Sequence, residues 1–329
     1  MRRMTVSEVL QLESVPPGST QPGVLPLNHS FDHWLHQHQS RAQQLIERFV
    51  PPEHPLVPQL HEAMHYAAAM GGKRVRPLLV WAAGECVQAD DQALDRAACA
   101  VELVHAYSLV HDDLPCMDDD VLRRGQPTTH VRFGEALALL AGDALQALAY
   151  EVLTPEADIA PALQARLCAL LARASGADGM AGGQTLDILA TGGAVSGDDL
   201  MHMHSRKTGA LLKASVLMGA ACGGFDTKHP AQTYTALETY GDAVGLAFQV
   251  VDDILDVTAD SHTLGKTAGK DAQQNKSTYV SALGLDAARK LAHGLRDKAQ
   301  AALDTLPPPQ RAASQRLREL ADLIVLREH

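Results

Sequence analysis

Cysteine, aromatic residues and uninterrupted hydrophobic stretches are all scarce in this chain of 329 residues. Its five cysteines are odd in number and include no CxxC pair, so neither a disulfide framework nor a cysteine-ligated zinc site is expected. Aromatic residues make up only 4% of the chain, and the abundance of Ala and Leu favours helices over sheets. No uncharged apolar run approaches the roughly 18 residues that span a bilayer, and we therefore expect no stable membrane insertion.

Positive charge is also in deficit, with 28 Lys and Arg residues against 39 Asp and Glu and a formal net charge of −11. A phosphate backbone requires a basic face, so this balance argues against a nucleic-acid-binding protein. It leaves room for a small anionic substrate held by a local cluster of cations. The first residues lack the apolar core of a signal peptide and soon carry Glu8 and Glu13, so we expect a cytoplasmic protein.

Helical periodicity extends over most of the chain, and no convincing series of strands is found. Residues 1–28 contain Val-Pro-Pro-Gly-Ser-Thr-Gln-Pro-Gly, a turn-rich mixture that predicts a disordered extension before a single domain at 29–329. We therefore predict an all-α fold, a single-domain bundle of roughly ten or more helices. Apolar residues at helical spacing predict these helices at 31–49, 58–70, 77–87, 92–113, 134–153, 160–175, 198–222, 231–257, 286–305 and 310–326.

Two aspartate-rich clusters follow strongly apolar helical segments. The first is Asp112-Asp113-Leu-Pro-Cys-Met-Asp118-Asp119-Asp120, and the second is Asp252-Asp253-Ile-Leu-Asp256. Carboxylates at this density repel one another and are costly to desolvate unless a cation neutralises them. Oxygen ligands without accompanying Cys or His favour Mg²⁺. A solvated acidic face is the alternative, and it would be the better interpretation of a single acidic run.

The spacing within the two clusters differs. Asp252 and Asp256 are four residues apart, so both project from one face of a helix. Asp112 and Asp118 are six residues apart, about 120° out of phase on a regular helix. Pro115 lies between them, and we expect the helix to distort or end there, which would bring Asp118 back towards Asp112.

Basic residues accompany the acidic clusters in four short groups. Arg offers a planar fork for phosphate oxygens and Lys a compact point charge. Each group alone is weakly specific, but together with the carboxylates they describe a cavity for two pyrophosphates, one bridged through metal and one held by cations. The groups are Lys73 with Arg76, Arg123 with Arg124, Arg206-Lys207-Thr208, and Lys266 with Lys276.

Taken in order, these motifs resemble the trans-isoprenyl diphosphate synthases, or polyprenyl synthetases, and most of all their bacterial farnesyl diphosphate synthase group. The resemblance runs from about Phe31 to the C-terminus. It rests on GGKRVRP (71–77), VELVHAYSLVHDDLPCMDDDVLRRGQPTTH (101–130), GMAGGQTLD (179–187), HSRKTGAL (204–211), GLAFQVVDDILD (245–256), GK (265–266) and NKST (275–278).

The resemblance implies a homodimer in which each bundle surrounds a central cavity, and it implies a role for each motif residue. Three Mg²⁺ ions, for which Mn²⁺ can substitute, would hold the diphosphate of an allylic substrate. Their ligands would be Asp112, Asp118, Asp252 and Asp256, supported by Asp113 and Asp253. The allylic diphosphate (dimethylallyl or geranyl) would also contact Arg123, Lys207, Thr208, Gln249, Lys266 and Lys276. Isopentenyl diphosphate would bind Lys73, Arg76, His105 and Arg124, although His105 taken alone reads as a core histidine.

The implied reaction is head-to-tail (1′-4) prenyl transfer, with the released pyrophosphate as the base. Tyr107 lies five residues before Asp112, about 7–8 Å along the helix axis. In the family, bulky side chains there close the pocket for the growing tail. Tyr107, with small Ser108 beside it, therefore predicts a C15 product, farnesyl diphosphate. A geranyl or geranylgeranyl diphosphate synthase, a terpene cyclase and a non-catalytic subunit of the same fold are the alternatives.

Overall fold

The structure, a computed structural model, describes residues 30–190, 197–224, 230–258 and 278–327. The chain divides into two units, Met1–Ser30 and Phe31–His329, and the fold below is that of the second. The predicted disorder of residues 1–28 lies outside the described residues. The predicted domain limits therefore stay a prediction.

Helices make up nearly all of the described chain, and the prediction of an all-α fold is confirmed. Helix α1 (Phe31–Phe49) ends before Pro51, and α2 (Pro58–Ala69) begins on a proline, a residue suited to the first helical turn. Helix α4 (Asp91–Asp112) begins after Asp90, whose carboxylate accepts hydrogen bonds from the backbone of the first turn. The other helices are α3 (Val75–Cys86), α5 (Thr129–Phe133), α6 (Glu135–Leu153), α7 (Pro161–Ser175), α8 (Met180–Ala190), α9 (Gly197–His204), η2 (Ser205–Gly209), α10 (Ala210–Cys222), α12 (Ala231–Thr258), α15 (Tyr279–Leu283), α16 (Leu285–Asp304), α17 (Pro308–Ala312) and α18 (Gln315–Leu326).

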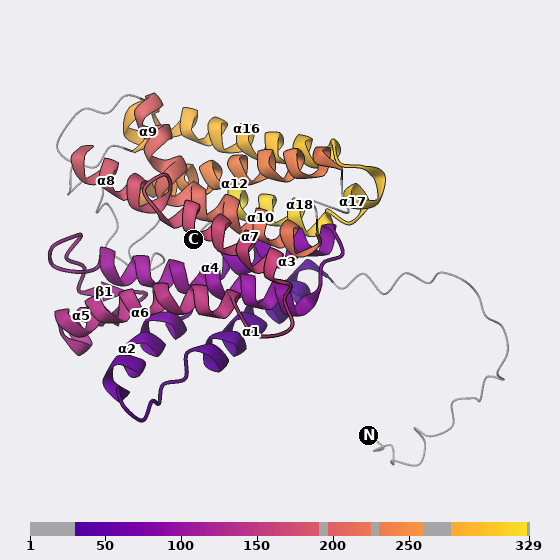
Figure 1. The fold of residues 1–329 in the computed structure, drawn as a ribbon. Helices are drawn as coiled ribbons and strands as arrows, with labels where there is room; N and C mark the ends of the chain where they lie inside the picture. The colour runs from indigo at the N-terminus through magenta and orange to yellow at the C-terminus, as the bar shows by residue number, and fades with distance from the viewer. Residues whose placement is uncertain (1–29, 191–196, 225–229, 259–277, 328–329) are drawn as a thin grey trace, which may run out of the picture. The chain divides into compact units, whose positions relative to one another are not determined.

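The core is built around α3 and α10, which are apolar on nearly every side. Every residue from Leu78 to Ala83 is at most 1% exposed, as expected of a helix enclosed by others. Helix α10 packs against α3, α12, α7 and α4, while α12 also packs along α16 and α4 along α6 (Figure 1). The two helices that carry the acidic clusters, α4 and α12, are thus both anchored on α10.

Several element boundaries differ from those predicted. The single helix expected at 198–222 is α9 and α10 joined by a π-helical turn, η2, and the one expected at 310–326 is divided into α17 and α18 at Ser314. Helices α5, α8 and α15 were not predicted. A two-residue antiparallel pair, β1 (Leu122–Arg123) with β2 (Gln126–Pro127), follows the first acidic cluster.

Helix α6 is the only helix of the described residues that is long and apolar enough, by length and composition, to cross a membrane. It packs against α4, α2 and α5, as a core helix does. A core helix passes the same test of length and composition, so one such helix is weak evidence for a membrane span.

Candidate active site

The first acidic cluster begins where α4 ends. Asp112 is the last helical residue and Asp113 caps the helix. The backbone N–H of Asp118 donates to the Asp112 carbonyl at 2.9 Å, so the turn through Pro115 returns the chain to the helix end. This is the distortion that the proline predicted, and it brings Asp118 close to Asp112.

Asp112 carries a perturbed carboxyl group. The pKa of Asp112 is raised to about 6: burial is the largest cause, the charges of Asp118 and Asp113 also raise it, and those of Lys207 and Arg123 lower it. The surrounding protein charges therefore do not offset the desolvation of this carboxylate. A cation bound beside it would stabilise the ionised form.

Asp113 is 3% exposed and forms a fork-like pair with Arg123. The guanidinium donates from Nη2 to Oδ1 at 2.6 Å and from Nε to Oδ2 at 2.9 Å. Two charge-assisted bonds of this kind fix both side chains. Arg123, expected to hold the allylic diphosphate, is thus oriented by Asp113 at the edge of the site.

The second acidic cluster lies near the end of α12. Its middle residue, Asp253, accepts hydrogen bonds from other parts of the protein. Asp253 Oδ2 accepts the backbone N–H of Tyr279 at 2.8 Å, at the start of α15. Its Oδ1 accepts Gln249 Nε2 at 2.9 Å, and Gln249 Oε1 accepts the Thr208 hydroxyl at 2.9 Å. This chain of bonds joins α12, α15 and η2.

The outer aspartates of the cluster differ from Asp253. Asp256 is 6% exposed, and its Oδ1 is buried without a hydrogen-bond partner in the described chain. Asp252 is more exposed and forms an ion pair with Arg327, Nη2 to Oδ1, at 2.5 Å. This pair was not predicted, because Arg327 is a lone arginine 75 positions away in the chain, outside any basic group.

One cavity of about 620 Å³ is lined by Asp112 of the first acidic cluster and by Asp252 and Asp253 of the second, whereas the predicted ligands Asp118 and Asp256 are not among its lining residues. No group of three or more metal-binding side chains gathers anywhere in the ranges that the structure describes. The anionic donors at the cavity are carboxylates, beside the rings of His105 and His111, and they include the uncompensated Asp112. This set suits Mg²⁺, which keeps waters and substrate oxygens in its coordination sphere, better than an ion enclosed by protein.

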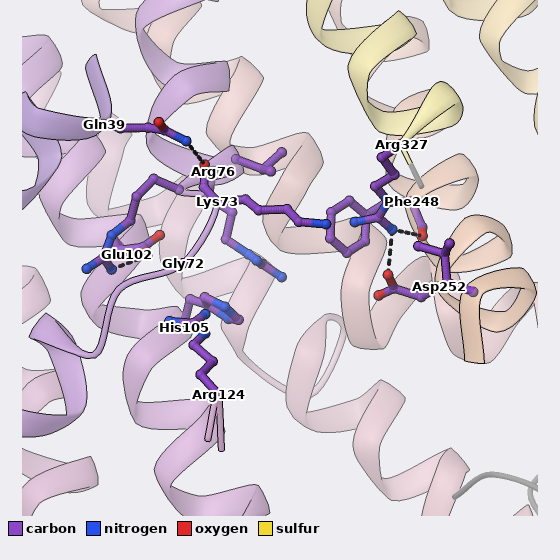
Figure 2. Close-up of a pocket in the computed structure, with 13 residues that line it drawn as sticks. Gln39, Gly72, Lys73, Arg76, Glu102, His105, Arg124, Phe248, Asp252 and Arg327 are labelled. Atoms are coloured by element: carbon purple, nitrogen blue, oxygen red, sulfur yellow. Dashed lines mark hydrogen bonds and ion pairs between the residues drawn. The ribbon is translucent and has the colours of Figure 1, made fainter. Parts of the chain in front are cut away.

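A second cavity of about 480 Å³ adjoins the first and is strongly basic. Lys73, Arg76, His105 and Arg124 line it, and Figure 2 shows Lys73 reaching towards Phe248 from the opposite side to Arg327 and Asp252. Arg76, His105 and Arg124 line both cavities. The four residues expected to bind isopentenyl diphosphate are therefore brought together.

Burial and neighbouring cations lower the pKa of two side chains in this second cavity, His105 and Lys73. Burial, then the charges of Arg76 and Arg124, lower the pKa of His105 well below its usual value, so the ring is neutral at pH 7. Burial and Arg327 likewise lower the pKa of Lys73. An anion entering the cavity would relieve this repulsion among cations.

The loop before α3 sets the geometry of that basic cavity. Arg74 adopts φ +54° and is held in a buried ion pair, Nη1 to Glu102 Oε1, at 2.6 Å. Gly72 has φ +122°, and a Cβ there would lie 2.6 Å from the Arg124 guanidinium. The backbone conformation at Gly72 therefore favours glycine, whereas the flexible Arg124 side chain can move aside. The sequence analysis missed the roles of Arg74 and Glu102.

Lys207 is presented to the larger cavity by the π-helical turn η2, a distortion common at functional sites. Its Nζ lies 2.5 Å from Asp187 Oδ2 on α8. Helix α8 approaches η2 so closely that a Cβ on Gly183 would lie 2.1 Å from the Lys207 backbone nitrogen. Thr208, on the same turn, also lines the cavity.

Helix α4 also lines the larger cavity through Tyr107 and Ser108, and the apolar side chains of Met117 and Ile188 line it as well. The Tyr107 ring meets the His111 ring edge-on, with 5.7 Å between centroids. Of the predicted site residues, Lys266 and Lys276 lie outside the described residues.

Comparison with known proteins identifies the family. A family model described as polyprenyl synthetase matches residues 57–305. The farnesyl diphosphate synthase of Escherichia coli is 48% identical over 291 residues, covering 87% of this chain and 95% of that protein. A chloroplastic geranylgeranyl pyrophosphate synthase of Capsicum annuum is 45% identical, covering 82% of this chain and 72% of the relative. A Helicobacter pylori geranyltransferase, solved with magnesium and isoprenyl diphosphate, superposes with a TM-score of 0.81 at 31% identity, covering 92% of this chain and all of that one.

Proposed function

The chain belongs to the polyprenyl synthetase family, and from this premise we propose that it condenses isopentenyl diphosphate with dimethylallyl or geranyl diphosphate to give farnesyl diphosphate and pyrophosphate. The observation that carries the proposal is a pair of adjoining cavities that share Arg76, His105 and Arg124. One is the basic cavity, and the other, which we call the acidic cavity after its aspartates, carries residues of both acidic clusters together with cations. Two diphosphate substrates need two such pockets, with their reacting carbons at the junction. Holding these carbons adjacent supplies much of the rate acceleration.

The acidic cavity is the proposed site of the allylic diphosphate. When bound, Mg²⁺ supplies stabilisation of the negative charge that grows on the departing diphosphate. Asp112, Asp118, Asp252 and Asp256 are the proposed ligands of three such ions. Asp113 and Asp253 hold Arg123, Gln249 and the start of α15 in place around them.

Cations of the chain itself stabilise the same leaving group. Lys207 and Arg123 line the cavity, and their charges interact with Asp112. Thr208 and Gln249 contribute neutral polar contacts, and we assign Lys266 and Lys276 to the same diphosphate from the motif alone. As the allylic C–O bond breaks, the double bond of isopentenyl diphosphate attacks the carbocation. The proton then lost passes to the released pyrophosphate, so no side chain is needed as the base.

The basic cavity is the proposed site of isopentenyl diphosphate. Lys73, Arg76 and Arg124 neutralise a diphosphate that does not leave during the reaction. Neutral His105 adds a hydrogen bond without adding charge. Water is excluded from the junction, which protects the carbocation from hydrolysis.

Product length is the finer part of the proposal. The side chain of Tyr107 lines the allylic cavity, and we propose that its ring closes the apolar end of that cavity and limits the product to C15. The geranylgeranyl synthase among the relatives makes a C20 product the second candidate.

Incubation of the purified protein with Mg²⁺, dimethylallyl diphosphate and labelled isopentenyl diphosphate tests the proposal. We expect a C15 diphosphate by mass spectrometry, and a loss of at least about 100-fold in turnover in Asp112→Asn and Asp252→Asn, because charge stabilisation of this kind is worth several kcal/mol. Asp297→Asn, an exposed position on α16, is the matched control. A protein that forms no prenyl product would be a non-catalytic subunit, and one that turns over without isopentenyl diphosphate would be a cyclase.

We also propose that the enzyme is a cytoplasmic homodimer. The outward side of α6 supports the dimer, because Leu139 and Leu140 there are 47% and 51% exposed. Val131, on the adjoining α5, is 49% exposed. An apolar face of this kind is suited to a second copy of the chain.

A further inference from the structure

Arg327, the residue after α18, contacts α12 and pairs with Asp252 of the second acidic cluster. Its Nη2 lies 2.5 Å from Asp252 Oδ1 and also donates to the Phe248 carbonyl at 3.0 Å. Its guanidinium carbon lies 4.1 Å from the centre of the Phe248 ring (Figure 2). Two hydrogen bonds and a cation–π contact thus fix one side chain on one turn of α12.

In this ion pair the side chain of Arg327 is buried, whereas that of Asp252 is exposed. The Arg327 side chain is 8% exposed, whereas that of Asp252 is 42% exposed. Arg327 Nε is buried without a hydrogen-bond partner in the described chain. The guanidinium is therefore incompletely satisfied where it lies, while the carboxylate that it holds remains accessible from the cavity.

The charge around this pair is strongly positive. Five basic and two acidic side chains line the basic cavity, and one of the two acids, Glu102, is already paired with Arg74. Asp252 is thus the only carboxylate lining it that faces the remaining cations. A divalent ion added while Arg327 stays on Asp252 would be repelled by the guanidinium and would share its carboxylate.

On the premise of the proposed function, in which Asp252 is a metal ligand, we propose that Arg327 is a counter-ion that competes with the metal. In the metal-free protein the guanidinium neutralises Asp252. When Asp252 binds a metal ion, its carboxylate would no longer hold the guanidinium, and Arg327 would be released to the edge of the basic cavity. Metal loading would thereby add a free cation to the pocket that binds the second diphosphate.

Binding of Mn²⁺ alone, measured by electron paramagnetic resonance, tests the competition without turnover. Arg327→Gln removes the competing charge, so we expect Mn²⁺ to bind roughly five- to tenfold more tightly than to the wild type, a typical coupling between two ligands of one site. Arg327→Lys keeps a weaker competitor and should lie between the two. Arg318→Gln, which removes an arginine of α18 paired with Asp304, should leave the affinity unchanged.

Introducing Arg327→Gln into an Asp252→Asn variant tests whether the effect depends on the Arg327–Asp252 ion pair. Without the carboxylate there is nothing to compete for, so Arg327→Gln should then have no effect on Mn²⁺ affinity. Hydrogen exchange gives a second readout: Mn²⁺ should speed the exchange of amides 323–326 in the wild type and change little in Arg327→Gln. Circular dichroism melts establish that each variant is folded.

Unchanged or weaker Mn²⁺ binding in Arg327→Gln would overturn the proposal, since a supporting arginine would strengthen the metal site. Absence of Mn²⁺ binding in both proteins would overturn it as well. The proposed function fails on a different result. If the wild type binds Mn²⁺ in competition with Arg327 but forms no prenyl product, the synthase activity is contradicted and the competition by Arg327 is supported. If the protein is an active synthase but Arg327→Gln does not change Mn²⁺ affinity, the proposed function is supported and the competition by Arg327 is contradicted.

Discussion

At the residue scale, one aromatic ring is proposed to set the length of the product. Tyr107→Ala would open the apolar end of the cavity by the volume of the ring, so we expect the product to shift from C15 towards C20. Product analysis by liquid chromatography and mass spectrometry measures the shift. Tyr107→Phe keeps the ring and is the control, which should still give C15. If Tyr107→Ala also stops at C15, another side chain closes the cavity.

His204 illustrates how burial of a single group makes stability depend on pH. Burial lowers its pKa from 6.5 to about 4, so the folded state resists a proton that the unfolded chain accepts. The unfolded state therefore binds more protons between these two values, and stability falls as the pH decreases through this window. Above pH 6.5 the contribution is constant.

Replacing His204 should remove this acid sensitivity. Between pH 7 and 4.5 the depressed pKa costs the wild type about 2 kcal/mol of unfolding free energy, which His204→Gln should not lose. Urea unfolding at both pH values measures the difference. His202→Gln, at an exposed position on the same helix, is the matched control. Equal pH dependence in wild type and His204→Gln would contradict the expectation.

At the element scale, the close approach of α8 to η2 depends on a glycine. A Cβ on Gly183 would lie 2.1 Å from the Lys207 backbone nitrogen, so Gly183→Ala must push the two elements apart. We expect a loss of about 1–3 kcal/mol in stability, typical of overpacking. Because Lys207 would move away from the cavity, the KM for the allylic diphosphate should rise.

A second glycine on a helix provides the control. A Cβ on Gly294, in α16, would meet nothing within 4 Å. Gly294→Ala should therefore stabilise the protein by up to about 1 kcal/mol, the difference in helix propensity. Thermal melts and steady-state kinetics on both variants separate the packing effect from a general effect of alanine. A Gly183→Ala variant as stable and active as the wild type would show that α8 shifts freely.

Elements were predictable where their signals are local. The prolines at 51 and 58 mark the end of α1 and the start of α2, as predicted, whereas α4 begins at Asp91, one residue before the predicted start. Helix α8 was missed because Gly182 and Gly183 weaken its helical signal, although Gly183 is what allows it to pack on η2. The π-helical turn inside 198–222 was equally invisible, since its residues read as ordinary helix.

The site, too, was predictable from the sequence only where its residues form a local motif. Family motifs predicted some of the residues that line the two cavities, among them Arg76, Asp112 and Asp252, and the membership of the family is confirmed. Pairs formed across the bundle, such as Arg74 with Glu102 and Asp252 with Arg327, leave no local pattern in the sequence. They arise only when α3, α4, α12 and the end of α18 come together.

At the scale of the whole molecule, the exposed apolar side of α6 is the surface where we propose that a second copy of the chain packs. Two exposed leucines in succession, Leu139 and Leu140, lie on a helix whose other side packs in the core. A stable dimer buries about 1,600 Å² in total, and its centre is apolar. Leu139→Glu with Leu140→Glu would place charges in that centre, at a cost of several kcal/mol, and should give monomers.

Sedimentation velocity distinguishes the two states. The wild type should sediment at twice the chain mass of 35.2 kDa, and the double variant at that mass. Leu283→Glu is the control, because Leu283 is also 47% exposed but lies on α15. A dimeric double variant would place the interface elsewhere, and a monomeric wild type would contradict the dimer altogether. Since α6 packs along α4, which carries Tyr107 and Asp112, loss of the dimer should also broaden the product lengths, a change that a distant interface would not cause.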